Sequence, residues 1–308
     1  VVIMSSLSFF RRINRTQLEL FLDRPMVEIV AVMQNCGLIR SHFDCPKCKI
    51  PCKNCRKPTP TWPGFGWRCP SCVTTYSGLT GSWFFRMRQD IRLILRMLYS
   101  FCWEQASLKS LQHELRQPND RTIAKQTHTD YLSFFREICS IDNDRQPPIG
   151  GFGTIVEIDE SAVCKRKHNR GKRIAPQQWL FGGVQRGDKK KLFVIPVKKR
   201  NAPTLLAAIA KFISPGTQIQ SDCWAAYGRI GRMGKHYQHP TVNHSMTFKF
   251  KINGACTNTI EGLWQKIKLP HKVRYGTHRT QLASWVAAAV WNQRHDKPDR
   301  FEAILAAI

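Results

Sequence analysis

Three Cys-x-x-Cys pairs within 28 residues are the feature that most constrains how this chain can fold. The outer pairs are Cys45/Cys48 and Cys69/Cys72, and 20 residues lie between them. Each pair offers two thiolates from one tight turn, so two pairs complete a closed, tetrahedral site. The sequence therefore predicts a zinc ribbon over 44–89, with a structural Zn²⁺ bound by these four cysteines.

The third pair, Cys52 and Cys55, leaves an alternative open, because only four ligands are needed. Pairing it with the last two cysteines would leave a loop of 13 residues. We favour the outer pairs, and the additional pair is then idle. The other six cysteines are scattered along the chain, which favours a reducing compartment with a metal site over a disulfide scaffold.

The charge of the chain indicates its class of partner. Among 308 residues, 48 Lys and Arg face 21 Asp and Glu, a net charge of +27, while 42% of the residues are apolar. This apolar content excludes a disordered basic tail, and the charge favours nucleic acid. We expect no membrane partner, because no apolar run approaches the roughly 20 residues that span a bilayer. The first residues, with arginines after the apolar stretch, are the reverse of a secretory signal.

Composition and hydrophobic periodicity divide the chain into segments around a Pro- and Gly-rich linker at 142–151. In order, we expect a helical N-terminal lead-in (1–43), the zinc ribbon (44–89), a helical segment (90–141), a catalytic-type core (152–296) and a C-terminal tail (297–308). The helical segment is either a helix-turn-helix that reads DNA or a small bundle.

The core is expected to be α/β, with strands over 154–163, 177–186, 191–197 and 217–222 and a fifth around 237–243. Helices are expected over 202–213, near 224–227, and over 258–269 and 277–294. This order is that of a ribonuclease H-like domain with a mixed five-stranded sheet. In such a sheet the first strand lies beside the fourth.

Three acids occupy the positions that this order brings together. Asp159 lies on the first strand, Asp222 ends the fourth, and Glu261 falls in the first turn of the penultimate helix. Converging carboxylates can hold a pair of Mg²⁺ (or Mn²⁺) ions that act on a phosphodiester. We expect Asp159 to bridge the ions. The neighbours Glu157 and Glu160 are expected to point away from Asp159, on the opposite face of the strand.

Basic residues around these acids are candidate DNA contacts. Lys268, two helical turns after Glu261, can hold a phosphate, and His244 can contact the reacting region. Asn258 is either an accessory ligand or a helix cap. The run after the first strand is expected to bind phosphates through Lys165, Arg166, Lys167, Arg170, Lys172 and Arg173.

Several ordered motifs resemble a known family. GTIVEIDESAVCKRKHNRGKR, QQWLFGGVQRG, SDCWAAY, TVNHS and CTNTIEGLWQKIK resemble the Merlin superfamily of DNA transposases and its bacterial insertion-sequence relatives, over roughly 43–295. The resemblance implies a DDE core that acts on transposon ends by a metal-dependent cut-and-paste route. It assigns the motif acids to Asp159, Asp222 and Glu261. Some relatives have Asn at the third position, and the Cys52/Cys55 pair departs from the pattern.

Two function classes therefore compete, an active transposase and a decayed or domesticated copy that binds DNA without cleaving it. A nuclease or resolvase on the same fold is a third interpretation. The expected partners are double-stranded DNA, as terminal inverted repeats and target, and further copies of the chain in a dimer or larger assembly. The expected location is the nucleus in a eukaryote, or the cytoplasm and nucleoid in a bacterium.

Overall fold

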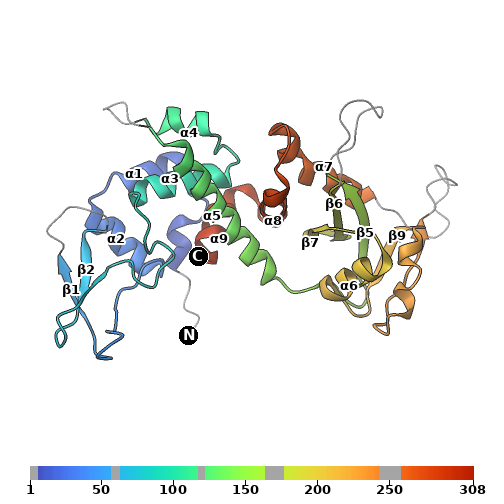
Figure 1. The fold of residues 1–308 in the computed structure, drawn as a ribbon, viewed down its shortest axis with the longest axis horizontal. Coiled ribbons are helices and arrows are strands. Elements are labelled where there is room, and N and C mark those ends of the chain that lie inside the picture. Colours follow the sequence, from blue (N-terminus) through green and yellow to red (C-terminus); the bar gives the residue numbers. More distant parts are fainter. Residues whose placement is uncertain (1–5, 57–62, 117–121, 164–176, 243–257) are drawn as a thin grey trace. The chain divides into compact units, whose positions relative to one another are not determined.

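The fold was analysed in a computed structural model, which describes residues 6–56, 63–116, 122–163, 177–242 and 258–308. The chain divides into two compact units. Unit 1 comprises residues 1–138 and 296–308, and unit 2 comprises residues 139–295. The division falls within one long helix, α5 (Lys125–Asp144). Figure 1 shows the order of the elements along the chain.

Unit 1 begins with a short 3-10 helix and two α-helices, η1 (Ser6–Phe10), α1 (Arg15–Leu22) and α2 (Met26–Asn35). Asn14 and Gln17 form a capping box at the start of α1, in which each side chain accepts from the backbone N–H of the other. Such a box satisfies amide groups that have no partner inside the helix. This arrangement fixes where α1 begins.

The ribbon is a three-stranded antiparallel sheet of β1 (Lys53–Arg56), β2 (Phe65–Arg68) and β3 (Thr75–Ser77). Aromatic rings form its small core. Phe65 packs edge-on against Trp67 at 5.4 Å between ring centroids, and Phe43 stacks on Trp67 at 6.3 Å. Because this core is so small, the ribbon depends on its cysteines for stability.

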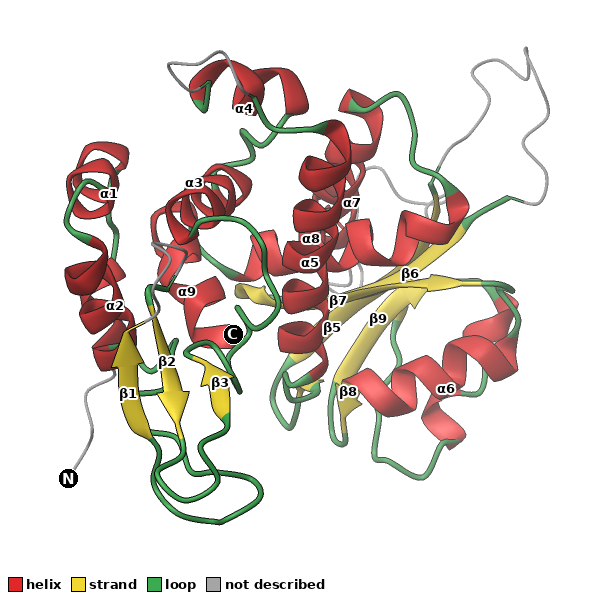
Figure 2. Ribbon diagram, turned by 60° about the vertical axis from the view of Figure 1, so that its left-hand side comes forward, coloured by secondary structure: helices red, strands yellow, loops and turns green. Residues whose placement is uncertain are grey.

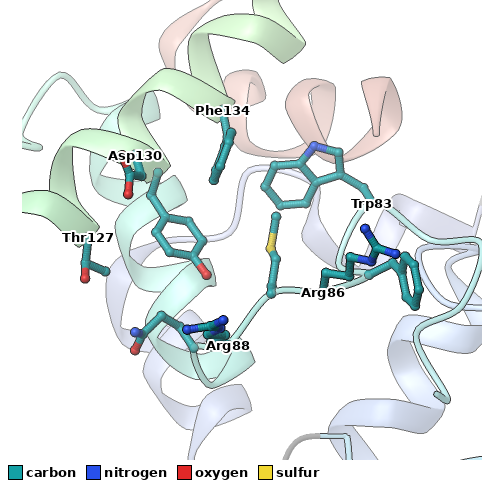
Figure 3. Close-up of a pocket in the computed structure, with 10 residues that line it drawn as sticks. Trp83, Arg86, Arg88, Thr127, Asp130 and Phe134 are labelled. Carbon is teal, nitrogen blue, oxygen red and sulfur yellow. The ribbon is translucent and has the colours of Figure 1, made fainter.

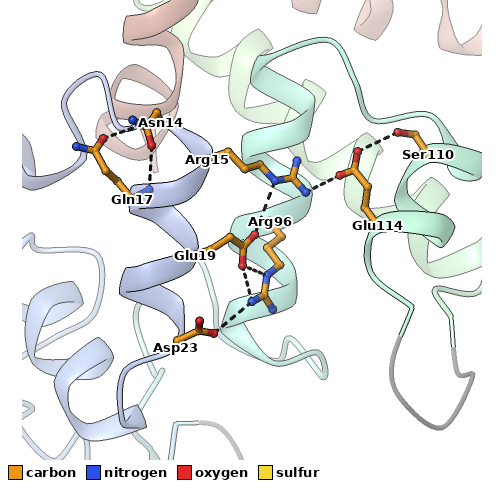
Figure 4. A network of polar contacts seen from close by, with 8 residues as sticks. All are labelled: Asn14, Arg15, Gln17, Glu19, Asp23, Arg96, Ser110 and Glu114. Atoms are coloured by element: carbon orange, nitrogen blue, oxygen red, sulfur yellow. Dashed lines mark hydrogen bonds and ion pairs between the residues drawn. The ribbon is translucent and has the colours of Figure 1, made fainter.

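Three helices follow, α3 (Ile91–Cys102), α4 (Leu108–Glu114) and α5. Arginines tie α1, α3 and α4 together (Figure 4): Arg96 on α3 pairs with Glu19 at 2.6 Å, and Arg15 on α1 pairs with Glu114 on α4. Residues 117–121, between α4 and α5, lie outside the described residues. The expected C-terminal tail contains η6 (Lys297–Asp299) and α9 (Arg300–Ala307), and Phe301 of α9 packs against Phe10 and Tyr99.

Unit 2 is built on a mixed five-stranded sheet in the order β10-β9-β5-β6-β7. Its strands are β5 (Ile155–Ala162), β6 (Trp179–Gln185), β7 (Asp188–Val197), β9 (Gln218–Asp222) and β10 (Thr241–Val242). β5, β6 and β7 are antiparallel neighbours, whereas β9 runs parallel to both β5 and β10. The expected neighbourhood of the first and fourth core strands, here β5 and β9, is thus confirmed.

Helices cover both faces of this sheet, as Figure 2 shows. On one face, α6 (Ala202–Phe212) buries Leu205 and Ile209 against Ile158 and Phe181. On the other face, α7 (Asn258–Val273) and α8 (Leu282–Arg294) pack on Leu180 and other sheet residues. Alternate residues of β6 and β7 enter opposite cores, because successive side chains of a strand point to opposite faces. The sheet is therefore buried on both sides around the candidate site.

Smaller elements complete unit 2. They are the paired short strands β4 (Ile149–Gly150) and β8 (Ile213–Ser214) and the 3-10 helices η3 (Ala225–Tyr227), η4 (Ile230–Arg232) and η5 (Arg279–Gln281). The fifth expected strand, 237–243, is shorter than predicted, since β10 covers only Thr241–Val242. In the part of the chain described by the structure, each helix falls short of the length or apolarity that crossing a bilayer requires.

Candidate functional site

The four predicted zinc ligands lie together in the ribbon. The sulfur atoms of Cys45, Cys48, Cys69 and Cys72 are all within 4.8 Å of one another. Four sulfurs at about 2.3 Å from a central zinc would be roughly 3.8 Å apart, and Cys45 Sγ lies 3.7 Å from Cys72 Sγ. The donor set and its spacing fit a closed, structural zinc site.

The two Cys-x-x-Cys turns have the same backbone geometry. Lys49 and Val73, each directly after the second cysteine of its pair, adopt positive φ values of 57° and 60°. Their amides donate to the carbonyls of Cys45, at 2.8 Å, and Cys69, at 3.1 Å. Non-glycine residues in this conformation are uncommon, so their repetition at matching positions indicates that the turns are shaped for a ligand.

Polar neighbours adjust the thiols. The Tyr76 hydroxyl, 3.5 Å from Cys45 Sγ, lowers the pKa of Cys45 to about 6. A hydrogen bond with Cys72 raises the pKa of Cys48 to about 11. Opposite shifts in one cluster mean that some of the thiols ionise before others. Zinc binding then has to displace the remaining protons, so zinc affinity depends on pH.

The additional pair is outside this cluster. Cys52 begins the segment that leads into β1, and Cys55 lies within β1 opposite Gly66. Both are half-buried and neither forms a disulfide. The outer-pair prediction is therefore the one that the geometry supports.

The candidate carboxylates converge through strand register. β5 and β9 pair in parallel with Val156 opposite Ile219 and Glu157 opposite Gln220. Continuing that register by two residues puts Asp159 level with Asp222. Level residues on adjacent parallel strands share a face and lie about 5 Å apart along the hydrogen-bonding direction. On this register the two acids belong to neighbouring strands and to the same face of the sheet, although 62 residues separate them in sequence.

Helix α7 supplies the third acid and two further polar groups on one face, Glu261, Trp264 and Lys268. Trp264 Nε1 donates to Asp159 Oδ2 at 2.8 Å, and Lys268 Nζ donates to Ser161 Oγ. Burial raises the pKa of Asp159, the hydrogen bond from Trp264 opposes that shift, and the charges of Asp222 and Glu261 raise the pKa further. Asp222 and Glu261 are therefore near enough to Asp159 for their charges to act on its carboxylate.

The carboxylates are less tightly clustered than the cysteines. Among the described residues, the four cysteines form the one group of three or more metal-ligating side chains at such short mutual distances. Asp159 is held by Trp264, and Asp222 Oδ1 accepts from the Trp224 amide at 3.0 Å. Glu261 is exposed. The arrangement is three acids that converge, two of them held by tryptophan N–H donors.

A glycine makes room for the tryptophan that contacts Asp159. Gly182 on β6 is the register partner of Asp159, and a Cβ at Gly182 would lie 3.0 Å from the Trp264 ring. The bare backbone at Gly182 therefore allows the indole to lie over β6 and reach the carboxylate. Neither Gly182 nor Trp264 was singled out from the sequence.

The position of Glu157 on its strand differs from the expected one. It was expected to point away from Asp159, but residues two apart on a strand share a face. Glu157 is fully buried, and its carboxylate accepts from the backbone N–H groups of Thr259 and Ile260 at 2.8 and 3.1 Å. It thus caps the first turn of α7, where a negative charge is favourable.

A wider network holds this cap in place. Glu157 Oε1 accepts from the Thr259 hydroxyl at 2.9 Å and pairs with Arg186 at 2.9 Å. Arg186, in the tight turn between β6 and β7, also donates to Gln220 on β9 at 2.6 Å. Glu157 and Arg186 together therefore connect β5, β9 and the β6–β7 turn to the helix that carries Glu261.

Glu160, the other neighbour, does lie on the face opposite Asp159. It is close to the buried Tyr227, and burial raises the pKa of Glu160 to about 7. His239, also unrecognised in the sequence, has its Nε2 atom 2.8 Å from the hydroxyl of Ser221 on β9. Its pKa is lowered by burial, so the ring is neutral at neutral pH. No motif marks His239 in the sequence, because isolated histidines are common.

Several predicted contacts cannot be located. His244 and the basic run with Lys165, Arg166, Lys167, Arg170, Lys172 and Arg173 lie outside the described residues. Asn258 begins α7 and is exposed, while Glu157 provides the cap that was considered for Asn258.

One family model matches a stretch within unit 2. Residues 150–291 match the family model of the ISXO2-like transposase domain. The matched stretch contains Asp159, Asp222 and Glu261 and ends within α8. The likeness of this stretch is to a transposase domain of the insertion-sequence type. A search of curated proteins gives no match to the chain.

The ribbon should lose its metal when one ligand is removed. In Cys69→Ser, we expect release of zinc and unfolding of residues 45–75, because metal binding and folding are coupled in such small modules. Zinc content measured by atomic emission, together with protease sensitivity, checks this. Cys52→Ser is the matched control and should retain about one zinc per chain. Equal zinc content in the two variants would contradict the ligand assignment.

The cap should be important for stability. Glu157→Gln replaces one carboxylate oxygen by an NH₂ group, which cannot accept a hydrogen bond. It also removes the negative charge that pairs with Arg186. We expect the free energy of unfolding to fall by about 2–4 kcal/mol, measured by chemical denaturation. Glu137→Gln, at an exposed position of α5, is the control and should change it by less than about 0.5 kcal/mol. Equal stabilities would show that the Glu157 contacts are unimportant.

Proposed function

We propose that this protein is a DDE-type DNA transposase that cleaves and joins DNA strands with Asp159, Asp222 and Glu261 as its catalytic carboxylates. The observation that carries the proposal is the parallel register of β5 and β9. It brings two of the acids level within the stretch that matches a transposase domain. Helix α7 carries the third acid on the face that contacts Asp159.

The donor set suits hard divalent cations. Mg²⁺ and Mn²⁺ prefer carboxylate oxygens, and a cation among the acids would offset the repulsion that Asp222 and Glu261 exert on Asp159. Asp159, Asp222 and Glu261 are the residues that would hold two such ions. When bound, such ions activate an attacking oxygen and stabilise the leaving oxygen of a phosphodiester.

The chain's own residues supply the rest of the site. Trp264 orients Asp159 through its indole N–H, and the Trp224 amide orients Asp222. Lys268 is at the Ser161 end of the same face, where its ammonium can bind a DNA phosphate without approaching the acids. Burial around Asp159 excludes water and strengthens each of these interactions.

The broader assignments are part of the same proposal. The core would be ribonuclease H-like, the family Merlin or a near insertion-sequence relative, and the substrate double-stranded DNA at terminal inverted repeats and target. Two DNA ends must be joined, so we propose that the chain acts as a dimer or larger assembly. It would then work wherever its DNA is, in the nucleus or in the bacterial nucleoid.

The catalytic prediction separates an active enzyme from a silent DNA-binding copy. Asp159→Asn, Asp222→Asn and Glu261→Gln should each reduce strand cleavage by at least ~10³-fold and leave DNA binding unchanged, because each amide loses the charge that holds metal. Cleavage of a labelled duplex that carries the element's ends, with Mg²⁺ or Mn²⁺, measures this. Ca²⁺ should permit binding without turnover.

Asp188→Asn, at the start of β7, is the matched control and should cleave normally. Near-normal cleavage by Asp159→Asn would refute the assignment of the three acids. A wild-type protein that binds DNA ends but never cleaves them would favour the silent copy.

The basic run is proposed to bind phosphates. Replacing Lys165, Arg166 and Lys167 by Ala should weaken binding to all duplex sequences and flatten the dependence of log K on log salt by up to about 3, since each phosphate contact contributes about 0.9. Fluorescence anisotropy at several salt concentrations measures this slope. The control removes the same charge from β7, in Lys189, Lys190 and Lys191, and should change the slope less. A change confined to sequence preference would instead indicate base reading.

A further inference from the structure

Unit 1 contains a cavity that the proposed catalytic function does not use. It has a volume of about 630 Å³ and lies between residues 83–89, which come after β3, and the first half of α5. In Figure 3, Trp83, Arg86 and Arg88 border it from the segment, and Thr127, Asp130 and Phe134 border it from α5. The volume lies within the range of about 300–1,000 Å³ typical of small-ligand sites.

Its walls are aromatic. Trp83 is fixed by stacking on Phe135, at 6.2 Å between centroids, and by an edge contact with Phe84. Phe134 lies on the α5 side, 5.9 Å from the Tyr131 ring, and is 41% exposed. A large aromatic side chain left this exposed beside a cavity is available to stack on a planar ligand.

The rim is cationic, with one acid. The guanidinium groups of Arg86 and Arg88 are exposed at the cavity, and Arg86 lies over the Phe85 ring at 5.3 Å. Asp130 is the one carboxylate among the lining residues, and its Oδ1 atom accepts from Gln126 Nε2 at 2.7 Å. The cavity therefore combines flat apolar faces, an anion-binding rim and one carboxylate as a hydrogen-bond acceptor.

We propose that this cavity binds an unpaired nucleotide of a DNA strand. A base offers the planar face that suits Trp83 and Phe134, its phosphate suits Arg86 and Arg88, and an exocyclic amino group suits Asp130. A duplex cannot fill the site, because its bases are stacked on one another and paired. The net charge of +27 favours this occupant over an uncharged aromatic ligand.

The inference deepens the proposed function, because strand cleavage at DNA ends is the reaction that would expose single-stranded nucleotides. Binding can nevertheless be measured without any cleavage, so either idea can fail alone. The probes are fluorescein-labelled twelve-nucleotide strands: oligo-dC, oligo-dT, and a strand of the same length with abasic sugars throughout. The abasic strand has the same phosphates and no base to stack.

Wild-type protein should bind oligo-dC at least tenfold more tightly than the abasic strand in an anisotropy assay. Phe134→Ala should lose about tenfold in affinity for oligo-dC and nothing for the abasic strand, as expected for one lost base stack. The matched control is Phe152→Ala, an aromatic residue 79% exposed in unit 2 and outside the cavity. It should bind both strands like the wild type.

Arg86 and Asp130 are tested by different measurements, because one is proposed to bind the phosphate and the other the base. Arg86→Ala should weaken binding of both strands, because it removes a phosphate contact, and Arg11→Ala, an equally charged exposed control, should have less effect. Asp130→Asn should abolish the preference for oligo-dC over oligo-dT, because cytosine has an amino donor where thymine has a carbonyl.

Thermal melting identifies variants that fail to fold. If Phe134→Ala does not fold, Phe85→Ala, also 41% exposed and lining the cavity, takes its place with the same expected result. Wild-type affinity of the folded variant for oligo-dC would overturn the proposal. So would an equal loss on the abasic strand, which would show that the cavity does not recognise a base.

Discussion

The buried carboxylate of Glu157 is the contact on which the candidate active site most depends. A charge with no exposure to water is costly unless its oxygens are all satisfied, and here two backbone amides, a hydroxyl and a guanidinium satisfy them. These donors come from α7 and from the turn between β6 and β7. The position of α7 relative to β5 is therefore set by electrostatics as well as by apolar packing. Since Glu261 lies in the same first turn of α7, the same contact helps to position the third proposed catalytic acid.

Because side chains alternate along β5, its polar and apolar residues lie on opposite faces of the sheet. On β5, Val156 and Ile158 enter the core below α6, whereas Glu157, Asp159 and Ser161 face α7. Each of these three polar residues has a partner on α7, in the order in which they occur along the strand. A strand and a helix that run together in this way hold a row of polar groups in fixed order. Side chains held on a strand and a helix are positioned more precisely than side chains on loops.

Local features of this fold were predictable from the sequence, and long-range ones were not. The cysteine spacing predicts the metal cluster because each Cys-x-x-Cys turn forms within four consecutive residues. The strands β6 and β7 are evident from their alternation, but β7 begins earlier than expected because its pairing with β6 continues up to the turn, where Gln185 pairs with Asp188. The roles of Glu157 and Trp264 depend on partners more than 100 residues away, and no local pattern reports such a contact. Gly182 is similar, since its lack of a side chain matters only because Trp264 lies over it.

The distance in sequence between Glu157 and α7 has a consequence for how the protein is made. The carboxylate and its helical partners are 102 residues apart, so during synthesis β5 leaves the ribosome long before α7 exists. Until then Glu157 has to remain hydrated or rely on Arg186 alone, and the sheet cannot close over it. Unit 2 can therefore bury Glu157 only after α7 has been synthesised. A chain that ended before α7 would carry Asp159 and Asp222 without the third proposed acid, so the proposed catalytic site would be complete only once α7 had been made.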